Sequence, residues 1–312
     1  MVKKVMKTAN PKIVSALIML LLCAALFTAC GGDSKGGGDE GGKKGSFKPS
    51  EFRDAVFDES KAEGSGEVKV DLSHTADGYF AVREDGGPKI KIQVIKEGEQ
   101  YLYDVRPGEE EIFPLQCGDG AYTINVMQNA GGTKYFELYS VKPDVKLSDK
   151  FQPYVRPNQY ANYKKSSKCV KKAGKIAASA TGEEDFIKQI YEYIADNVKY
   201  DKDKAASIKK GYIPDPDKTL KEGKGICFDY ACLAASMLRS QGIPTRIIFG
   251  YVEPDDLYHA WNMFYTEKDG WSSVEFKVNP KDWSRIDLTF YANGEDEEFI
   301  GDGSNYTEVY KY

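Results

Sequence analysis

One cysteine and one histidine are the residues of this chain best suited to chemistry. Cys227 stands in GICFDYA, at the predicted start of an apolar helix that Gly242 ends, and His259 stands in the aromatic strand segment YHAWN. A thiol at its free pKa of about 8.5 needs activation. The unpaired N–H groups of a helix N-terminus favour a thiolate and can hold a developing oxyanion. The two residues therefore predict a thiol nucleophile with a histidine base.

Two acids compete to orient the imidazole. Glu275 and Asp287 each stand four residues after a tryptophan, Trp271 and Trp283 respectively, so the spacing does not choose between them. Asp287 is favoured because it lies in the β-like run WSRIDLTF, whereas Glu275 belongs to the preceding strand VEFKV. The segment NPKD (279–282) is the predicted hairpin turn between these strands.

In this order, GICFDYA, HAWN and W-x-x-x-D-x-T-F resemble the motifs of the transglutaminase-like superfamily of papain-type cysteine enzymes, in particular its bacterial surface members. The resemblance covers roughly residues 180 to 291. It implies a catalytic triad in which Cys227 is the nucleophile, His259 the base and Asp287 the orienting acid. The family usually has a proline after this aspartate, where the chain has Leu288.

The N-terminus reads as an export signal. Four lysines precede an apolar run from Ile13 to Phe27, which is short for a transmembrane span. The block Phe27-Thr28-Ala29-Cys30 resembles a bacterial lipobox, although leucine is usual where Phe27 stands. That resemblance implies a lipoprotein with Cys30 as its lipid-modified membrane anchor. A simple secretory signal or a short uncleaved anchor is the alternative.

The charge of the exported chain argues against nucleic acid as a partner. The whole chain has a formal net charge of −5, and the first 30 residues contain four lysines and no acids. Without them 39 basic residues face 48 acidic ones, a net charge of about −9. The Gly-rich segment 31–46 that follows is a predicted flexible tether.

Short alternating segments between residues 65 and 148 predict an all-β sandwich. Seven strands are expected, with the sequences EVKVDLS, GYFAVRE, PKIKIQVIK, QYLYDVR, EEIFPLQ, AYTINVMQ and KYFELYSVK. The fold class is therefore α+β, with an N-terminal β-sandwich and a papain-like, transglutaminase-type catalytic domain. The predicted organisation is a signal peptide (1–30), the tether (31–46), the sandwich (47–148), a connector (149–180) and the catalytic domain (181–312).

A helix should follow the connector. Thr181 and Glu184 form a predicted capping box, and Phe186, Ile190, Ile194 and Val198 repeat every four residues on one face. This face should pack in the core.

Two tyrosines near the motifs, Tyr212 and Tyr258, are predicted to line the active-site cleft. The segment before Cys227, which contains Tyr212, should border that cleft.

The remaining cysteines and histidine carry simpler expectations. Cys117 and Cys169 are available for a disulfide in an oxidising compartment, and Cys232 is most simply a buried apolar residue. His74 is expected in an exposed loop rather than as a ligand. Neither a metal site nor an organic cofactor is expected, because no CxxC or calcium-loop pattern is present.

These observations predict an exported, lipid-anchored thiol enzyme on the outer face of a bacterial membrane. It would act on a carboxamide or peptide carbonyl of a protein or peptide, with cell-wall material as one source, through an acyl-enzyme. Transamidation and hydrolysis are both open. The alternatives are a cysteine peptidase or amidase of the cell surface, a catalytically silent surface binding protein, and a structural surface module dominated by the sandwich.

Overall fold

Alternation of apolar and polar residues builds the N-terminal half of the molecule. The computed structural model describes residues 45–252, 257–278, 286–291 and 306–312, and only the backbone of 252, 257, 274–278, 286–291 and 306. In β4 (Ile90–Lys96), Ile90, Ile92 and Val94 are buried while the residues between them are less so. This period of two lets each strand cover a core with one face.

These strands form two antiparallel four-stranded sheets within the described residues. One has the order β1-β2-β3-β6, with β1 (Glu63–Ser65), β2 (Val68–Asp71), β3 (Tyr79–Glu84) and β6 (Glu110–Pro114). The other has the order β5-β4-β8-β9, with β5 (Glu99–Asp104), β8 (Thr123–Gly131) and β9 (Lys134–Val141). Buried residues of both sheets belong to one apolar cluster, as in a sandwich. The seven predicted strands are confirmed. Strand β1 is additional, and β7 (Gly120–Ala121) and β10 (Asp144–Val145) form a further short pair.

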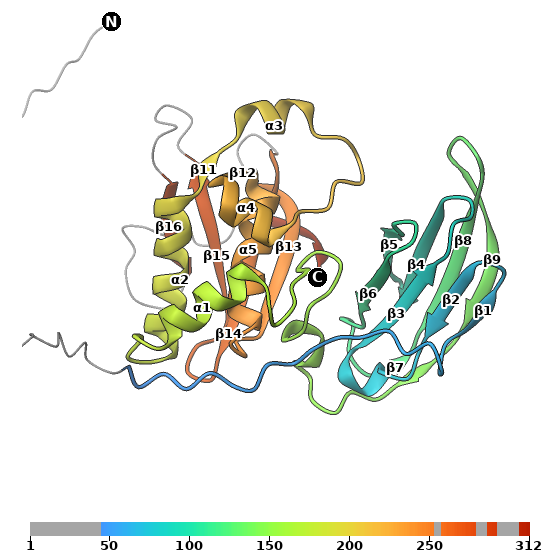
Figure 1. Ribbon diagram of the computed structural model, residues 1–312, viewed down its shortest axis with the longest axis horizontal. Coiled ribbons are helices and arrows are strands. Elements are labelled where there is room, and N and C mark those ends of the chain that lie inside the picture. The colour runs from blue at the N-terminus through green and yellow to red at the C-terminus, as the bar shows by residue number, and fades with distance from the viewer. Residues whose placement is uncertain (1–44, 253–256, 279–285, 292–305) are drawn as a thin grey trace, which may run out of the picture. The chain divides into compact units, whose positions relative to one another are not determined.

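The C-terminal half combines helices with one antiparallel sheet (Figure 1). Its helices are α1 (Lys168–Ala177), α2 (Glu183–Asn197), α3 (Lys202–Ser207), α4 (Pro216–Glu222) and α5 (Cys227–Arg239). The sheet order is β16-β15-β14-β13-β17, with β13 (Thr245–Val252), β14 (Leu257–Thr266), β15 (Gly270–Val278), β16 (Ile286–Tyr291) and β17 (Tyr306–Lys311). The short strands β11 (Lys199–Tyr200) and β12 (Lys224–Gly225) pair in parallel just before α5. The α+β fold class is confirmed.

Helix α2 buries the predicted face, but its N-terminus differs from the prediction. Phe186, Ile190 and Ile194 are buried, as the spacing requires. The helix begins at Glu183 after Gly182, and Thr181 donates to the Asp185 carboxylate through both its N–H (2.7 Å) and its hydroxyl (2.9 Å). The predicted Thr181–Glu184 capping box is therefore wrong, because the nearer acid Asp185 takes the donors of Thr181.

Part of the predicted connector is helical. Helix α1 was not predicted, although its buried residues Cys169, Val170, Ala173 and Ala177 have helical spacing. Lysines occupy six of the positions from 164 to 175, and they obscured this apolar face in the sequence. The side chain of Asp217 accepts hydrogen bonds from the N–H groups of Lys168 and Cys169 (both 2.9 Å), which caps α1 from another helix.

Residues 42–312 form one compact unit, and aromatic contacts join its two halves. The ring of Tyr312 lies 5.6 Å from that of Tyr103 on β5 and 5.6 Å from that of Phe249 on β13. Among the described residues, no helix is long and apolar enough to cross a membrane. The predicted signal peptide with Cys30, nearly all of the tether and the NPKD turn lie outside the described residues.

Candidate active site

Cys227 is the first residue of α5, as the sequence predicts. Ile226 before it has extended backbone angles (φ −98°, ψ 173°) and no side-chain acceptor, so it cannot cap the first N–H groups of the helix. Main-chain N–H groups of Ala260, Phe228 and Cys227 itself approach the sulfur. These groups are the donors that a thiolate or an oxyanion would use.

Burial outweighs these donors in its effect on the thiol pKa. It raises the pKa of the Cys227 thiol, and the nearby N–H groups only partly offset that rise. Burial likewise lowers the pKa of the His259 imidazole to about 4. Burial therefore opposes the stabilisation of a thiolate that the helix N-terminus was expected to give. Both shifts favour the neutral forms of the two groups, the thiol and the imidazole.

His259 lies on β14, next to the residue that contacts the thiol. It pairs with Gly250 of β13, and its ring stacks near that of Trp261, with centroids 6.5 Å apart and planes at 17°. A Cβ at position 250 would lie 2.8 Å from the Trp261 ring, so a glycine is needed beneath the tryptophan. Trp261 thus packs over the partner residue of His259 and limits the space around the imidazole.

Among the described residues, Cys227 and His259 share no hydrogen bond. Asn262 of β14 faces α5, since its amide donates to the carbonyl of Ala231 (3.0 Å). Because side chains alternate along a strand, His259 and Trp261 occupy the other face of β14. The Cys227 sulfur contacts β14 at the Ala260 N–H. The pairing of β14 with β15 begins two residues later, where Asn262 lies opposite Val274.

Glu275 lies on β15, the neighbour of β14, and Asp287 lies on β16, one strand further out. Glu275 is opposite Thr289, and Asp287 is opposite Lys277, in the β15–β16 pair. Strands β15 and β16 thus form the predicted hairpin. Positions 275 and 277 are two apart, so the register gives positions 275 and 287 the same side of the sheet. Their side chains lie outside those described, and the choice between Asp287 and Glu275 stays open.

Another acid near the thiol, Asp229, was not predicted as a site residue. Its side chain has no exposed surface, and its Oδ2 accepts the Ile226 N–H (2.7 Å). The ammonium of Lys204 on α3 lies 2.8 and 2.7 Å from its two oxygens, and the Tyr212 hydroxyl donates to Oδ1. The C-x-D spacing in GICFDYA is the sequence signal for this cluster, because it places an acid at the third position of the helix.

The two tyrosines predicted to line the cleft have different environments. Tyr212 is partly buried and committed to Asp229 and Lys204. Tyr258 is half exposed (50%), and its ring lies 5.3 Å from that of Tyr251 in an edge-on contact. Cys227 is among the charges that raise the pKa of Tyr258, after burial and two other tyrosines, which indicates proximity to the thiol. Tyr258 is thus the more accessible of the two.

The other cysteines are free thiols in the structure. Cys117 is partly buried, and Cys169 and Cys232 are buried. Cys169 packs beside Asp217, and burial raises its pKa. The suggested Cys117–Cys169 bridge is therefore not present. Cys232 is a core residue of α5, as predicted. His74 is partly buried between Asp71 and Asp77 and stacks on Tyr79 (4.8 Å), so its expected exposed position is wrong.

Among the described residues, no group of three or more histidine, cysteine or acidic side chains is placed to hold a metal ion.

In a comparison with known proteins, the region from α1 to β15 matches a protein family. Residues 170–276 match the model of the transglutaminase-like superfamily. These residues form a transglutaminase-like domain. The match contains Cys227, His259 and Glu275 and ends before Asp287. The match confirms the resemblance to this superfamily; it includes the motifs GICFDYA and HAWN, and W-x-x-x-D-x-T-F lies beyond its end.

Individual relatives are distant. A curated UPF0252 protein of Methanocaldococcus jannaschii is 37% identical over 62 residues, which are 18% of this chain and 18% of that protein. A solved structure of a candidate cysteine protease from Cytophaga hutchinsonii is 20% identical, covers 75% of this chain and 91% of its own, and has a TM-score of 0.37. Red sea bream transglutaminase is 14% identical, with 63% and 47% covered and a TM-score of 0.29.

Proposed function

We propose that the chain is a thiol acyl-transfer enzyme in which Cys227 attacks a carboxamide or peptide carbonyl. The observation that carries this proposal is the position of Cys227 as the first residue of α5, with main-chain N–H groups around its sulfur and His259 next to the residue that it contacts. A sulfur that meets several N–H donors is suited to an addition that leaves a negative oxygen beside them.

The reaction would proceed through a thioester. The Cys227 proton passes to His259 as the sulfur–carbon bond forms, and the oxyanion that results is held by main-chain N–H groups. Collapse of this adduct breaks the carbon–nitrogen bond, and the imidazolium returns the proton to the leaving amine or ammonia. An amine or water then attacks the thioester with His259 as base, and the thiol is released. Asp287, or Glu275 in its place, would orient the imidazole.

A glutamine-containing peptide separates the reaction types. Ammonia release without chain cleavage, with an added primary amine retained on the peptide, would establish transamidation; ammonia release without amine retention would establish deamidation. Peptide fragments would establish the peptidase alternative. Activity that survives in Cys227→Ala would refute the thiol mechanism, whereas Cys232→Ala is a neighbouring control that should keep its activity.

A silent surface binding protein is the second candidate, supported by the missing hydrogen bond between Cys227 and His259 in the described residues. It predicts that a surface ligand binds equally well to wild type and to Cys227→Ala and that neither protein forms a thioester. A thiol enzyme instead predicts a thioester in wild type and none in Cys227→Ala.

We also propose that the protein is exported and held on the outer face of the cell membrane through a lipid on Cys30. The lysine-rich start, the apolar run and the lipobox-like block support this proposal. Metabolic labelling with an alkyne fatty acid should mark the wild-type protein and not Cys30→Ala. Release of unlabelled wild type into the medium would favour a simple secretory signal.

A further inference from the structure

The Asp229 carboxylate, two residues after the nucleophile, is buried together with a cation. Its two oxygens receive the Lys204 ammonium at 2.7 and 2.8 Å, the Ile226 N–H at 2.7 Å and the Tyr212 hydroxyl. Gly225 permits this approach, since a Cβ there would lie 2.6 Å from Cβ of Asp229. The carboxylate has no contact with water, so its charge depends on these partners for stabilisation.

The segment that supplies the cation is held by polar contacts, which include the Asp201 N–H to the Gly225 carbonyl (2.9 Å) and the Lys224 ammonium to Asp201 (3.0 Å). None of the residues of α3 is buried, so apolar packing does not fix this helix. The Asp201 side chain caps it by accepting the Lys204 N–H (3.0 Å), and Lys204 and Tyr212 then bind Asp229. The polar cluster thus fastens the segment 201–212, whose later part lines a shallow surface depression, to the N-terminus of α5.

The charge balance of this cluster acts directly on the thiol. Asp229 raises the pKa of Cys227, after burial, because a nearby negative charge disfavours a thiolate. Other titratable groups that interact with the Cys227 thiol are Tyr200 of β11, Tyr258 of β14 and Cys232 of α5. Among the described residues, Lys204 is the cation that forms an ion pair with Asp229, and its positive charge offsets that of the carboxylate.

We propose that Lys204 is a positioning residue for the Cys227 thiol: it neutralises the Asp229 carboxylate and holds the segment 201–212 against the start of the catalytic helix. The inference rests on the proposed function, since it concerns the reactivity of the same thiol. It assigns to Lys204 the task of keeping a buried negative charge from suppressing thiolate formation.

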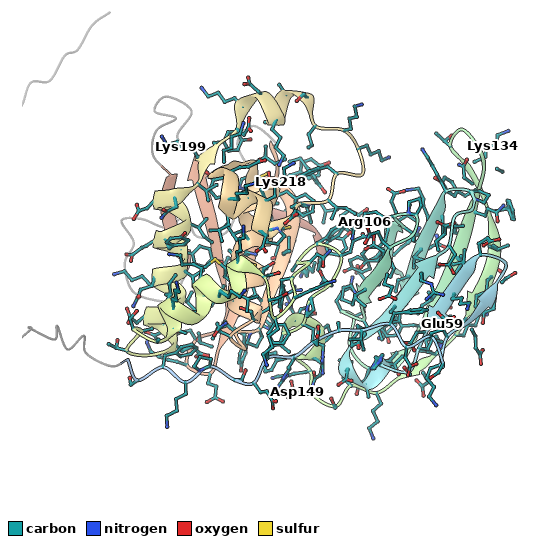
Figure 2. The ribbon with its side chains drawn as sticks, viewed as in Figure 1. Glu59, Arg106, Lys134, Asp149, Lys199 and Lys218 are labelled. Carbon is teal, nitrogen blue, oxygen red and sulfur yellow. The ribbon has the colours of Figure 1, made fainter. Side chains whose placement is uncertain are left out.

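The test is the pH dependence of Cys227 alkylation by iodoacetamide, mapped by mass spectrometry in the unit 42–312. In Lys204→Met the apparent thiol pKa should rise by about one unit, which lowers the rate at pH 8 about tenfold. Lys204→Arg should stay within about twofold of wild type, since it keeps the charge. Lys218→Met is the matched control, because Lys218 is an exposed lysine of α4 (Figure 2).

Substitution of the acid separates a charge effect from structural damage. Asp229→Asn should raise the rate above that of wild type, and Lys204→Met/Asp229→Asn should return it to within about threefold of wild type. A purely structural role predicts lower rates in all three proteins. Circular dichroism establishes which variants fold. If Lys204→Met alone fails to fold, Asp229→Asn is compared with Lys204→Met/Asp229→Asn, since neither of these proteins contains an unpaired buried carboxylate.

The outcomes keep this inference apart from the proposed function. A reactive wild-type Cys227 with Lys204→Met equal to Lys218→Met would overturn the role of Lys204 and leave the thiol enzyme standing. A double variant no faster than Lys204→Met would do the same. A wild-type Cys227 that is inert at every pH, while the protein is folded, would overturn both.

Discussion

Replacing Gly250 by alanine should destabilise the catalytic half of the molecule. Gly250 lies on β13 between β14 and β17, opposite His259. An added Cβ would be 2.1 Å from the main-chain oxygen of Thr307 and 2.8 Å from the Trp261 ring. The ring has some freedom to move, but the Thr307 oxygen belongs to the β17 backbone. Relief therefore requires the β13–β17 pair to separate.

The magnitude follows from the cost of overpacking. Forcing a methyl group into a filled space costs about 1–3 kcal/mol and more where backbone must move, so about 3 kcal/mol is expected. For a unit of this size about 2–4 °C of melting temperature corresponds to 1 kcal/mol. Gly250→Ala should thus melt about 6–12 °C below wild type, measured by circular dichroism on residues 42–312.

Gly174→Ala is the matched control. Gly174 is inside α1, and a Cβ there would meet nothing within 4 Å. Alanine in a helix interior is favoured over glycine by about 0.5–1 kcal/mol, so this variant should melt slightly above wild type. Equal melting temperatures for Gly250→Ala and wild type would refute the packing of Trp261 and Thr307 against position 250.

Three further outcomes are expected. Asn262→Ala should lower the free energy of unfolding by about 1–3 kcal/mol in urea titrations, because the buried amide donates to the carbonyls of Ala231 and Arg246; an unchanged midpoint would contradict this tie between α5 and the sheet. The pKa of His259 is lowered to about 4 in the folded protein, so between about pH 6.5 and 4 the unfolded chain binds more protons and stability falls with decreasing pH. His259→Gln should remove part of that fall, at most about 1.4 kcal/mol per pH unit, and parallel stability curves for the two proteins would count against a buried neutral imidazole. Alkylation of unreduced, denatured 42–312 should modify all four cysteines, Cys117, Cys169, Cys227 and Cys232, whereas two modifications would indicate a disulfide.

Most secondary structure could be predicted from sequence because periodicity reports burial directly. The strands of the sandwich alternate, and α2 repeats its apolar residues every four positions, so both were found. Helix α1 escaped because its small buried residues are separated by lysines. The N-terminus of α2 differs because a choice between neighbouring acids, Glu184 and Asp185, depends on backbone geometry that a motif does not contain.

The sequence could predict where Cys227 and His259 lie in the fold, at the start of a helix and on a strand, but not the energetics around them. Motif order identified Cys227 and His259, and the structure places both near the main chain at Ala260. Whether the thiol ionises depends on the balance between N–H donors and desolvation, which is a property of the packed site. The Lys204–Asp229 contact joins residues 25 positions apart, and Lys204 lies on α3, which has no buried residues. No periodic pattern in the sequence therefore predicts this contact.

Acylation of the thiol by an activated ester tests the central claim most directly. Mixing residues 42–312 with p-nitrophenyl acetate should release a rapid burst of one equivalent of nitrophenol, and mass spectrometry should place the acetyl group on Cys227 as a hydroxylamine-labile thioester. The burst should be absent in Cys227→Ala, much slower in His259→Ala and unchanged in Cys232→Ala. A burst that persists in Cys227→Ala, or folded wild-type protein without acylation at Cys227, would contradict the assignment of this chain as a thiol enzyme.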